Sequence, residues 1–456
     1  MKNRAGFIES ADAAAPVTTF ERLADSRSAW LVLACAAMAL RLGFALLAPH
    51  VDALSGVVAF GSDGYEKIAA NLLDGNGYRI RNDVAPTMLR NPGYVLVVAG
   101  AFAAFGRDKL VGIVLQALTA GAITLLIRPV GCRMAGRQAA FLGAIMYALY
   151  PPDWLASAKY IAEPLMGVLI LLMLLAADAV IRRPSVVTAL LLGALGGALV
   201  LTKSVGVLLL PCLLVALVLI SPEQRRNPLR TASLGFVALA LQVALLVPWG
   251  AYNYERSGRF VLTSTIAGWA LFDSHFIANY EGPEVSPTRL WLEARKSARA
   301  IAAENGIFPD PRDDWAFTFA DIHDEIAMGD LLKRRAVEGI EAAPLRFAGG
   351  MLRRSAEFWY AGRSDTSTLI GAAINLPICA VALWGFWRRA LYRSPLALIG
   401  LAVIVYMNGI TALSFAVARY SIPVMPIVLV FAASSFVQRR ETASVETLAP
   451  SRLAHV

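Results

Sequence analysis

The sequence predicts an all-α polytopic membrane protein with about ten transmembrane helices, within a range of roughly 8 to 12. Of its 456 residues, 57% are hydrophobic and only 16% are charged, whereas a soluble globular protein carries about 25% charged residues. The apolar residues form long runs separated by short connections that carry arginine. A helix satisfies its own backbone polar groups in lipid, and the runs lack the alternating pattern of an outer-membrane barrel.

Ten apolar runs justify the helix count, and the arginine clusters between them set the orientation. Arginine-rich connections follow residues 127, 181, 220, 386 and 437, and we expect these connections in the cytoplasm. Only one crossing is then available between residues 49 and 128, so the shorter run 92–105 is expected to be a helix on the outer leaflet. The ten runs are residues 29–48, 110–127, 138–150, 161–181, 186–201, 205–220, 231–249, 369–386, 395–413 and 417–437.

The remaining segments divide between the two sides of the membrane. The N-terminal segment 1–28 and the tail 438–456 are expected in the cytoplasm, and two long segments on the outer face. The first loop, 49–109, belongs to a transmembrane core of residues 29–249, and the second loop, 250–368, precedes the C-terminal helices 369–437. Charged amphipathic stretches in the second loop, such as 321–343, predict surface helices.

The rare polar residues near the outer ends of the predicted helices are candidate site residues. An ionisable side chain close to hydrocarbon costs several kcal/mol, so it indicates a functional role. A few carboxylates and several cations at one leaflet suggest a site for an anionic ligand that resides in the membrane. The set is Asp63, Tyr65, Glu66, Arg90, Asn91, Glu163, Lys203, Asn253, Arg256, Arg419 and Tyr420.

Simpler interpretations exist for the sharpest of these candidates. Lys203 could snorkel from a plain turn, Arg419 could anchor a helix at the interface, and Asp63 could cap a helix or sit in a solvated turn. Arg41, inside the first run, is expected to have a structural partner. The net charge of +9 gathers in connections that orient helices, so nucleic acid is not an expected partner.

Several motifs in chain order resemble one family. They are SDGYEKIAANL at 62–72, GNGY at 75–78, RNPGY at 90–94, Glu163, LTK at 201–203, PWGAYNYERSGRFV at 248–261 and ARYSIP at 418–423. Together they resemble the GT-C glycosyltransferases, which include protein O-mannosyltransferases and lipid A aminoarabinose transferases. The resemblance covers most of the chain. It implies a GT-C fold in which Asp63 matches the catalytic carboxylate of the first outer loop.

The resemblance implies an integral enzyme of a bacterial inner membrane whose active site faces the periplasm. Such an enzyme transfers a hexosyl or pentosyl group from a polyprenyl-phosphate sugar to a glycan, lipid or protein acceptor, with the donor tail among membrane lipids. For an inverting displacement, the hypothesis assigns Asp63 as a general base whose pKa is raised by apolar surroundings. Lys203, Arg256 and Arg419 are expected to bind the donor phosphate.

The other candidates complete the expected site. Tyr65, Glu66, Arg90, Asn91, Glu163, Asn253 and Tyr420 would orient donor or acceptor. No cofactor is expected to be required, although Mg²⁺ or Mn²⁺ could bind between a carboxylate and a phosphate. The alternatives are a transporter or flippase for a lipid-linked or anionic substrate, and a scaffold without catalysis. Convergence of Asp63, Lys203 and Arg419 around one place would favour the enzyme.

Overall fold

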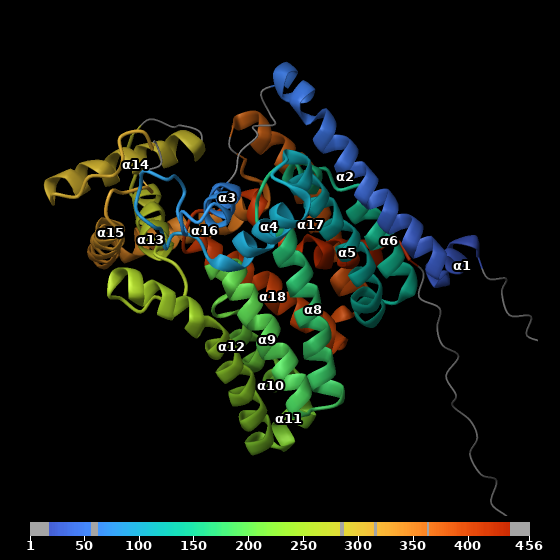
Figure 1. Cartoon of the computed structure of the whole chain (residues 1–456). Helices are drawn as coiled ribbons and strands as arrows, with labels where there is room; N and C mark the ends of the chain where they lie inside the picture. Colours follow the sequence, from blue (N-terminus) through green and yellow to red (C-terminus); the bar gives the residue numbers. More distant parts are fainter. Residues whose placement is uncertain (1–17, 56–62, 283–286, 314–316, 363, 438–456) are drawn as a thin grey trace, which may run out of the picture.

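The computed structural model describes residues 18–55, 63–282, 287–313, 317–362 and 364–437, and every regular element within these ranges is helical (Figure 1). The all-α class predicted from the sequence is therefore confirmed. The tail 438–456, most of segment 1–28 and part of the first loop, 56–62, lie outside the described residues.

Within the described ranges, six helices are long and apolar enough to cross a membrane, and each coincides with a predicted run. Buried small residues and aliphatic side chains pack these helices against one another in one large apolar core, as expected where close helix approach replaces the hydrophobic effect. The six are α2 (Arg27–Ser55), α5 (Lys109–Ala135), α8 (Glu163–Arg182), α12 (Pro228–Ser257), α17 (Asp365–Arg388) and α18 (Pro395–Ala412).

Four shorter apolar helical segments accompany the long ones. They are α4 (Pro92–Phe105), α9 (Val186–Thr202), η1 with α10 (Ser204–Gly206 and Leu209–Ile220), and η3 with α19 (Ala418–Val424 and Met425–Ser434). The run 138–150 forms only α6 (Arg137–Ala148), whose 12 residues are fewer than the ~20 that a span needs.

The helix α12 is longer than its apolar run. The run ends at Trp249, but the helix continues to Ser257, where Gly258 ends it in a left-handed conformation with φ of 68°. Residues 250–257, which the sequence analysis assigned to the start of the second loop, therefore belong to the same helix as the predicted span. The helix continues through Pro248, although this residue has no backbone N–H to donate, and it ends only at the left-handed Gly258.

The second loop forms a helical unit with its own core. The helices α13 (Ile266–Ala278), α14 (Pro287–Glu304) and α15 (Ile322–Ala342) share a core that contains Trp269, Phe272, Met328 and Leu332. The last helix of this loop, α16 (Pro344–Tyr360), instead contributes Phe358 to the large apolar core. Figure 1 places α13 to α15 beside α3 (Tyr65–Leu73) at one side of the bundle. The arginine-bearing α11 (Pro222–Arg226) lies at the opposite end, as the charge rule expects. The remaining elements are α1 (Thr19–Asp25), α7 (Pro151–Ser157) and η2 (Leu391–Arg393).

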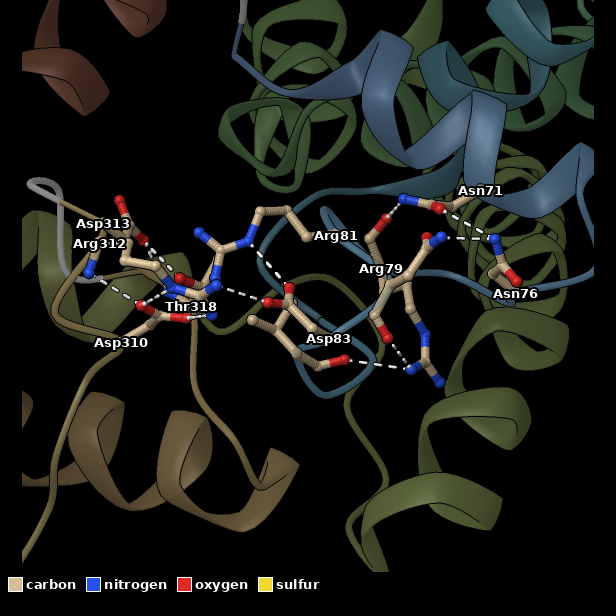
Figure 2. Close-up of polar contacts among 11 residues, drawn as sticks. Asn71, Asn76, Arg79, Arg81, Asp83, Asp310, Arg312, Asp313 and Thr318 are labelled. Carbon is tan, nitrogen blue, oxygen red and sulfur yellow. Dashed lines mark hydrogen bonds and ion pairs between the residues drawn. The ribbon is translucent and has the colours of Figure 1, made fainter.

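Ion pairs join the first loop to the second loop (Figure 2). Arg312 contacts Asp310 at 2.7 Å within the second loop. Across the two loops, Arg81 pairs with Asp310, and Arg312 contacts Asp83 at 2.7 Å. These residues belong to segments more than 200 positions apart, so the contacts fix the two loops against each other. They lie on the same side of the molecule as α3, which places the second loop next to the candidate site.

Candidate functional site

Asp63 and Arg419 form a bidentate ion pair that joins the first loop to the last apolar segment. Nη1 and Nη2 of Arg419 donate to Oδ1 and Oδ2 of Asp63 at 3.2 and 2.8 Å. Asp63 directly precedes Gly64, whose φ of 86° favours glycine and turns the chain into α3. Arg419 lies in the short 3₁₀ helix η3 that begins the final apolar segment. The fork matches the planar guanidinium to the planar carboxylate.

Glu163 and Lys203 extend this contact into a chain of alternating charges. Glu163 is the first residue of α8 and Lys203 follows the last residue of α9; both positions suit their charges, because a helix N-terminus favours an anion and a C-terminus a cation. Nζ of Lys203 donates to Oε1 of Glu163 at 2.6 Å, and Nε of Arg419 lies 2.9 Å from the same oxygen. Four residues from four distant parts of the sequence therefore form one cluster.

The cluster is buried on one side and accessible on the other. The side chains of Asp63, Arg419 and Lys203 are 17%, 21% and 19% exposed, whereas that of Glu163 is 1% exposed. The second carboxylate oxygen of Glu163, Oε2, is buried and accepts no hydrogen bond from the described residues. A ligand can therefore reach both cations and Asp63, while Oε2 of Glu163 lies buried within the same cluster.

Arg90 and aromatic rings complete the surroundings of Asp63. Nε of Arg90 donates to the backbone carbonyl of Asp63 at 2.8 Å, and its guanidinium lies 5.8 Å from the Tyr65 ring centroid. Nζ of Lys203 lies 4.6 Å from the centroid of Tyr420, and the Arg419 guanidinium carbon lies 5.3 Å from it. Cations held over aromatic faces keep their charge while losing water.

The electrostatics correct one prediction. Apolar surroundings were expected to raise the pKa of Asp63. Burial does oppose its ionisation, but the charges of Arg419, Arg90 and Lys203 outweigh burial and hold the pKa of this carboxyl well below its usual range. In the resting protein Asp63 is an ion-paired carboxylate, which is a weak base.

The structure distributes the other predicted residues around this cluster. Asn91 is buried and donates from Nδ2 to the carbonyl of Val200 at 2.8 Å, three residues before Lys203. Gly93 packs against the same helix end, since a Cβ there would lie 2.7 Å from the Leu201 carbonyl carbon. Glu66 lies in the first turn of α3. Asn91 and Gly93 thus hold the first loop against the end of α9.

Asn253 and Arg256 lie on the extension of α12. Asn253 is buried and donates to the carbonyl of Val261 at 2.7 Å, which ties the end of α12 to the following chain. Arg256 is exposed, and its guanidinium lies 5.5 Å from the Tyr252 ring centroid. Among the contacts of the described residues, Arg256 makes none with Asp63, Glu163, Lys203 or Arg419. The structure thus brings together two of the three predicted phosphate-binding cations.

Two buried charged residues have partners that sequence reasoning did not name. Arg41 pairs with Asp153 at 2.8 Å and donates to the carbonyls of Tyr147 and Ala148 at 2.8 Å each, so its expected structural role has a complete set of contacts. Glu325 of α15 accepts from the backbone N–H of Met88 in the first loop. The sequence could have indicated that Glu325 is buried, because the residue lies on the same apolar helix face as Ile322, Ile326 and other buried residues of α15.

Within the described residues, no group of three or more His, Cys, Asp or Glu side chains is arranged to hold a metal ion. The oxygens of Asp63 and Oε1 of Glu163 instead face Arg419 and Lys203. These cations offer the neutralising charge that a metal would bring to a phosphate.

Comparisons with known proteins give distant structural similarities. No family model matches the chain, and no curated protein matches it. One similar structure is the crystal structure of ArnT from Cupriavidus metallidurans bound to undecaprenyl phosphate, whose sequence is 16% identical to this chain. The superposition covers 90% of this chain and 78% of that chain, with a TM-score of 0.41. The same protein in the apo state is 17% identical, with coverages of 84% and 76% and a TM-score of 0.38. Neither similarity assigns this chain an activity.

Proposed function

We propose that this chain is a GT-C glycosyltransferase that transfers a sugar from a polyprenyl-phosphate donor to an acceptor hydroxyl. One observation carries the proposal: Asp63, Arg419, Glu163 and Lys203, which are widely separated in sequence, form one partly accessible cluster among helix ends. A carboxylate and several cations are the groups that such a transfer requires. The sequence motifs that resemble the GT-C family contain all four residues.

Arg419 and Lys203 are the proposed ligands of the donor phosphate. Both are ion-paired in the resting protein, so an arriving phosphate competes with Asp63 and Glu163 for them. A phosphate diester offers oxygens of the same geometry as a carboxylate, so it can take over the Arg419 fork. Donor binding therefore replaces the Asp63 carboxylate on Arg419 by the donor phosphate, and the buried guanidinium keeps an anionic partner throughout.

This exchange gives Asp63 its catalytic function. When the Arg419 fork moves to the phosphate, the main charge that lowers the pKa of Asp63 is shared with the donor, and the pKa rises. Asp63 then accepts the proton of the acceptor hydroxyl as its oxygen attacks the anomeric carbon. The bond from that carbon to the phosphate oxygen breaks, its electron pair stays on the polyprenyl phosphate, and the anomeric configuration is inverted. The base is thus active only when the donor is present.

Glu163 and the aromatic residues are proposed to orient the substrates. The free Oε2 of Glu163 can accept a hydrogen bond from a sugar hydroxyl, and the rings of Tyr65 and Tyr420 border the same cluster. We further propose that the site faces the periplasm of a bacterial inner membrane, since the arginine-rich α11 lies at the opposite end of the bundle. The convergence of charges at one place favours the enzyme over a transporter or scaffold.

The test is sugar transfer by the purified full-length protein in lipid nanodiscs. Donors are identified by mass spectrometry of the lipid-linked sugars that accumulate in a deletion strain. Asp63→Asn should lower the transfer rate by about 10²- to 10⁴-fold, the contribution of a general base. The matched control is Asp74→Asn, an exposed carboxylate of the same loop that pairs with Arg107 at 2.7 Å, which should retain the wild-type rate. Folded Asp63→Asn with the wild-type rate would contradict the proposal.

A further inference from the structure

The segment 85–91 of the first loop, which we call the Arg90 segment, is held by the second loop. The Ala85 N–H donates to the carbonyl of Phe319 at 2.9 Å, and the Thr265 N–H donates to the carbonyl of Met88 at 3.2 Å. The side chains of Met88 and Leu89 are buried in clusters with residues of α13 and α15. The conformation of this segment therefore depends on the second loop.

Glu325 provides the central polar contact of this interface. Its Oε1 accepts from the Met88 N–H at 3.0 Å and from Oγ1 of Thr265 at 2.6 Å. The residue is 2% exposed, and among the described residues it forms no ion pair. Burial raises the pKa of Glu325, and hydrogen bonds from Thr265, Thr87 and Met88 only partly offset this effect. An apolar residue would fill this position at a lower desolvation cost, so packing alone does not account for a carboxyl group here.

The other end of the Arg90 segment enters the candidate site. Arg90 follows Met88 by two residues and donates to the Asp63 carbonyl at 2.8 Å. Its own carbonyl accepts from Oη of Tyr78 at 3.0 Å, and the next residue, Asn91, is anchored on Val200. A displacement of the backbone at Met88 would therefore move Arg90 and, through it, the backbone of Asp63.

We propose that Glu325 is a positioning residue for the transfer reaction, which acts on Asp63 through Met88 and Arg90. The inference rests on the proposed function. Lys203 follows the last residue of α9 and Arg419 lies in η3, and among the contacts of the described residues neither touches Glu325, Met88 or Arg90. The role of Glu325 therefore concerns the placement of the base and not donor binding. A loss of Glu325 should therefore lower kcat and leave the KM for the donor nearly unchanged.

The experiment measures steady-state transfer by the full-length enzyme in nanodiscs with the polyprenyl-phosphate sugar that it uses. Glu325→Ala should lower kcat by about 10- to 100-fold with the donor KM within about twofold, because small misplacements of catalytic groups are costly. Glu325→Gln keeps a carbonyl that can accept from Met88 and should restore kcat to within about threefold of wild type. Glu338→Ala is the matched control, since Glu338 is a 64% exposed carboxylate of the same helix, and it should retain the wild-type kcat.

A double-mutant cycle separates positioning from general stability. If Glu325 acts through Arg90, then Glu325→Ala should change kcat by less than about threefold in an Arg90→Ala background. If Glu325→Ala does not fold, Glu325→Asp replaces it in the cycle, because it retracts the acceptor by about 1.5 Å while it keeps the charge. Glu325→Asp should likewise change kcat by less in the Arg90→Ala background than in the wild-type background.

Four outcomes would overturn the inference. A wild-type kcat in folded Glu325→Ala, or a full effect of this substitution on top of Arg90→Ala, refutes the positioning role while the transferase stands. A rise in donor KM with unchanged kcat refutes the assignment to the base. A wild-type protein that transfers no sugar from any polyprenyl-phosphate donor refutes the proposed function and this inference with it.

Discussion

Replacing Arg419 by lysine tests the central contact of the site, because it keeps the charge and removes the fork. Arg419 makes two hydrogen bonds to Asp63 and an ion pair with Glu163 at 2.9 Å. A lysine ammonium is a point charge and cannot bind a carboxylate or phosphate at two parallel positions. One charge-assisted hydrogen bond contributes about 1.5–3 kcal/mol. If the fork binds the donor phosphate in the transition state, kcat should fall by about 10- to 150-fold.

The assay is the initial rate of sugar transfer in nanodiscs at saturating donor, with the melting temperature of each variant measured in parallel. Arg346→Lys is the matched control, because Arg346 is an exposed arginine of the outer segment that pairs with Glu281 at 2.9 Å. It should retain the wild-type rate. If Arg419→Lys melts like the wild type and keeps more than half of its kcat, the phosphate role of Arg419 is refuted.

Two further predictions concern pH and stability. Arg419, Arg90 and Lys203 lower the pKa of Asp63 in the free protein, so Asp63 stays ionised as the pH falls until that lowered pKa is reached. Donor binding draws Arg419 away from Asp63 and raises the pKa of this carboxyl. With falling pH, kcat should therefore decline at a higher pH than kcat/KM for the donor. Coincident acidic limbs in the two pH profiles would show that the cations do not exchange. Arg41→Met should reduce the free energy of unfolding by about 3–5 kcal/mol, because Asp153 would remain buried without its partner, and Arg41→Met/Asp153→Leu should recover most of the loss. Thermal melting in detergent checks this, and a single variant as stable as the wild type would contradict it.

The membrane helices could be predicted from local sequence, and their ends could not. Apolar composition over about 20 residues identifies a span because lipid offers no alternative partner for the backbone. The end of α12 at Ser257 depends on the left-handed conformation of Gly258, and α6 already ends at Ala148, shortly before Pro151 begins the next helix; the apolar pattern reports neither end. The convergence of Asp63, Glu163, Lys203 and Arg419 was expected from their common position at helix ends.

The sequence was less informative about the environment of each charge. It predicted a raised pKa for Asp63 from its apolar neighbours, but the sign depends on three cations from distant segments. Arg256 belongs to a family-like motif, yet its contact in the structure is with Tyr252. The apolar helix face around Glu325 indicated that this residue is buried, but its partner, Met88, lies more than 200 residues away and could not be identified.

The amino-acid sequence by itself determined that this chain is a helical membrane protein and which polar residues lie at its helix ends, because hydropathy and charge act locally along the chain. Only the tertiary structure decided which charges touch. The energy of an ion pair falls steeply with distance and with access to water. The protonation of Asp63 and the link from Glu325 to the site therefore depend on contacts between segments that lie far apart along the chain.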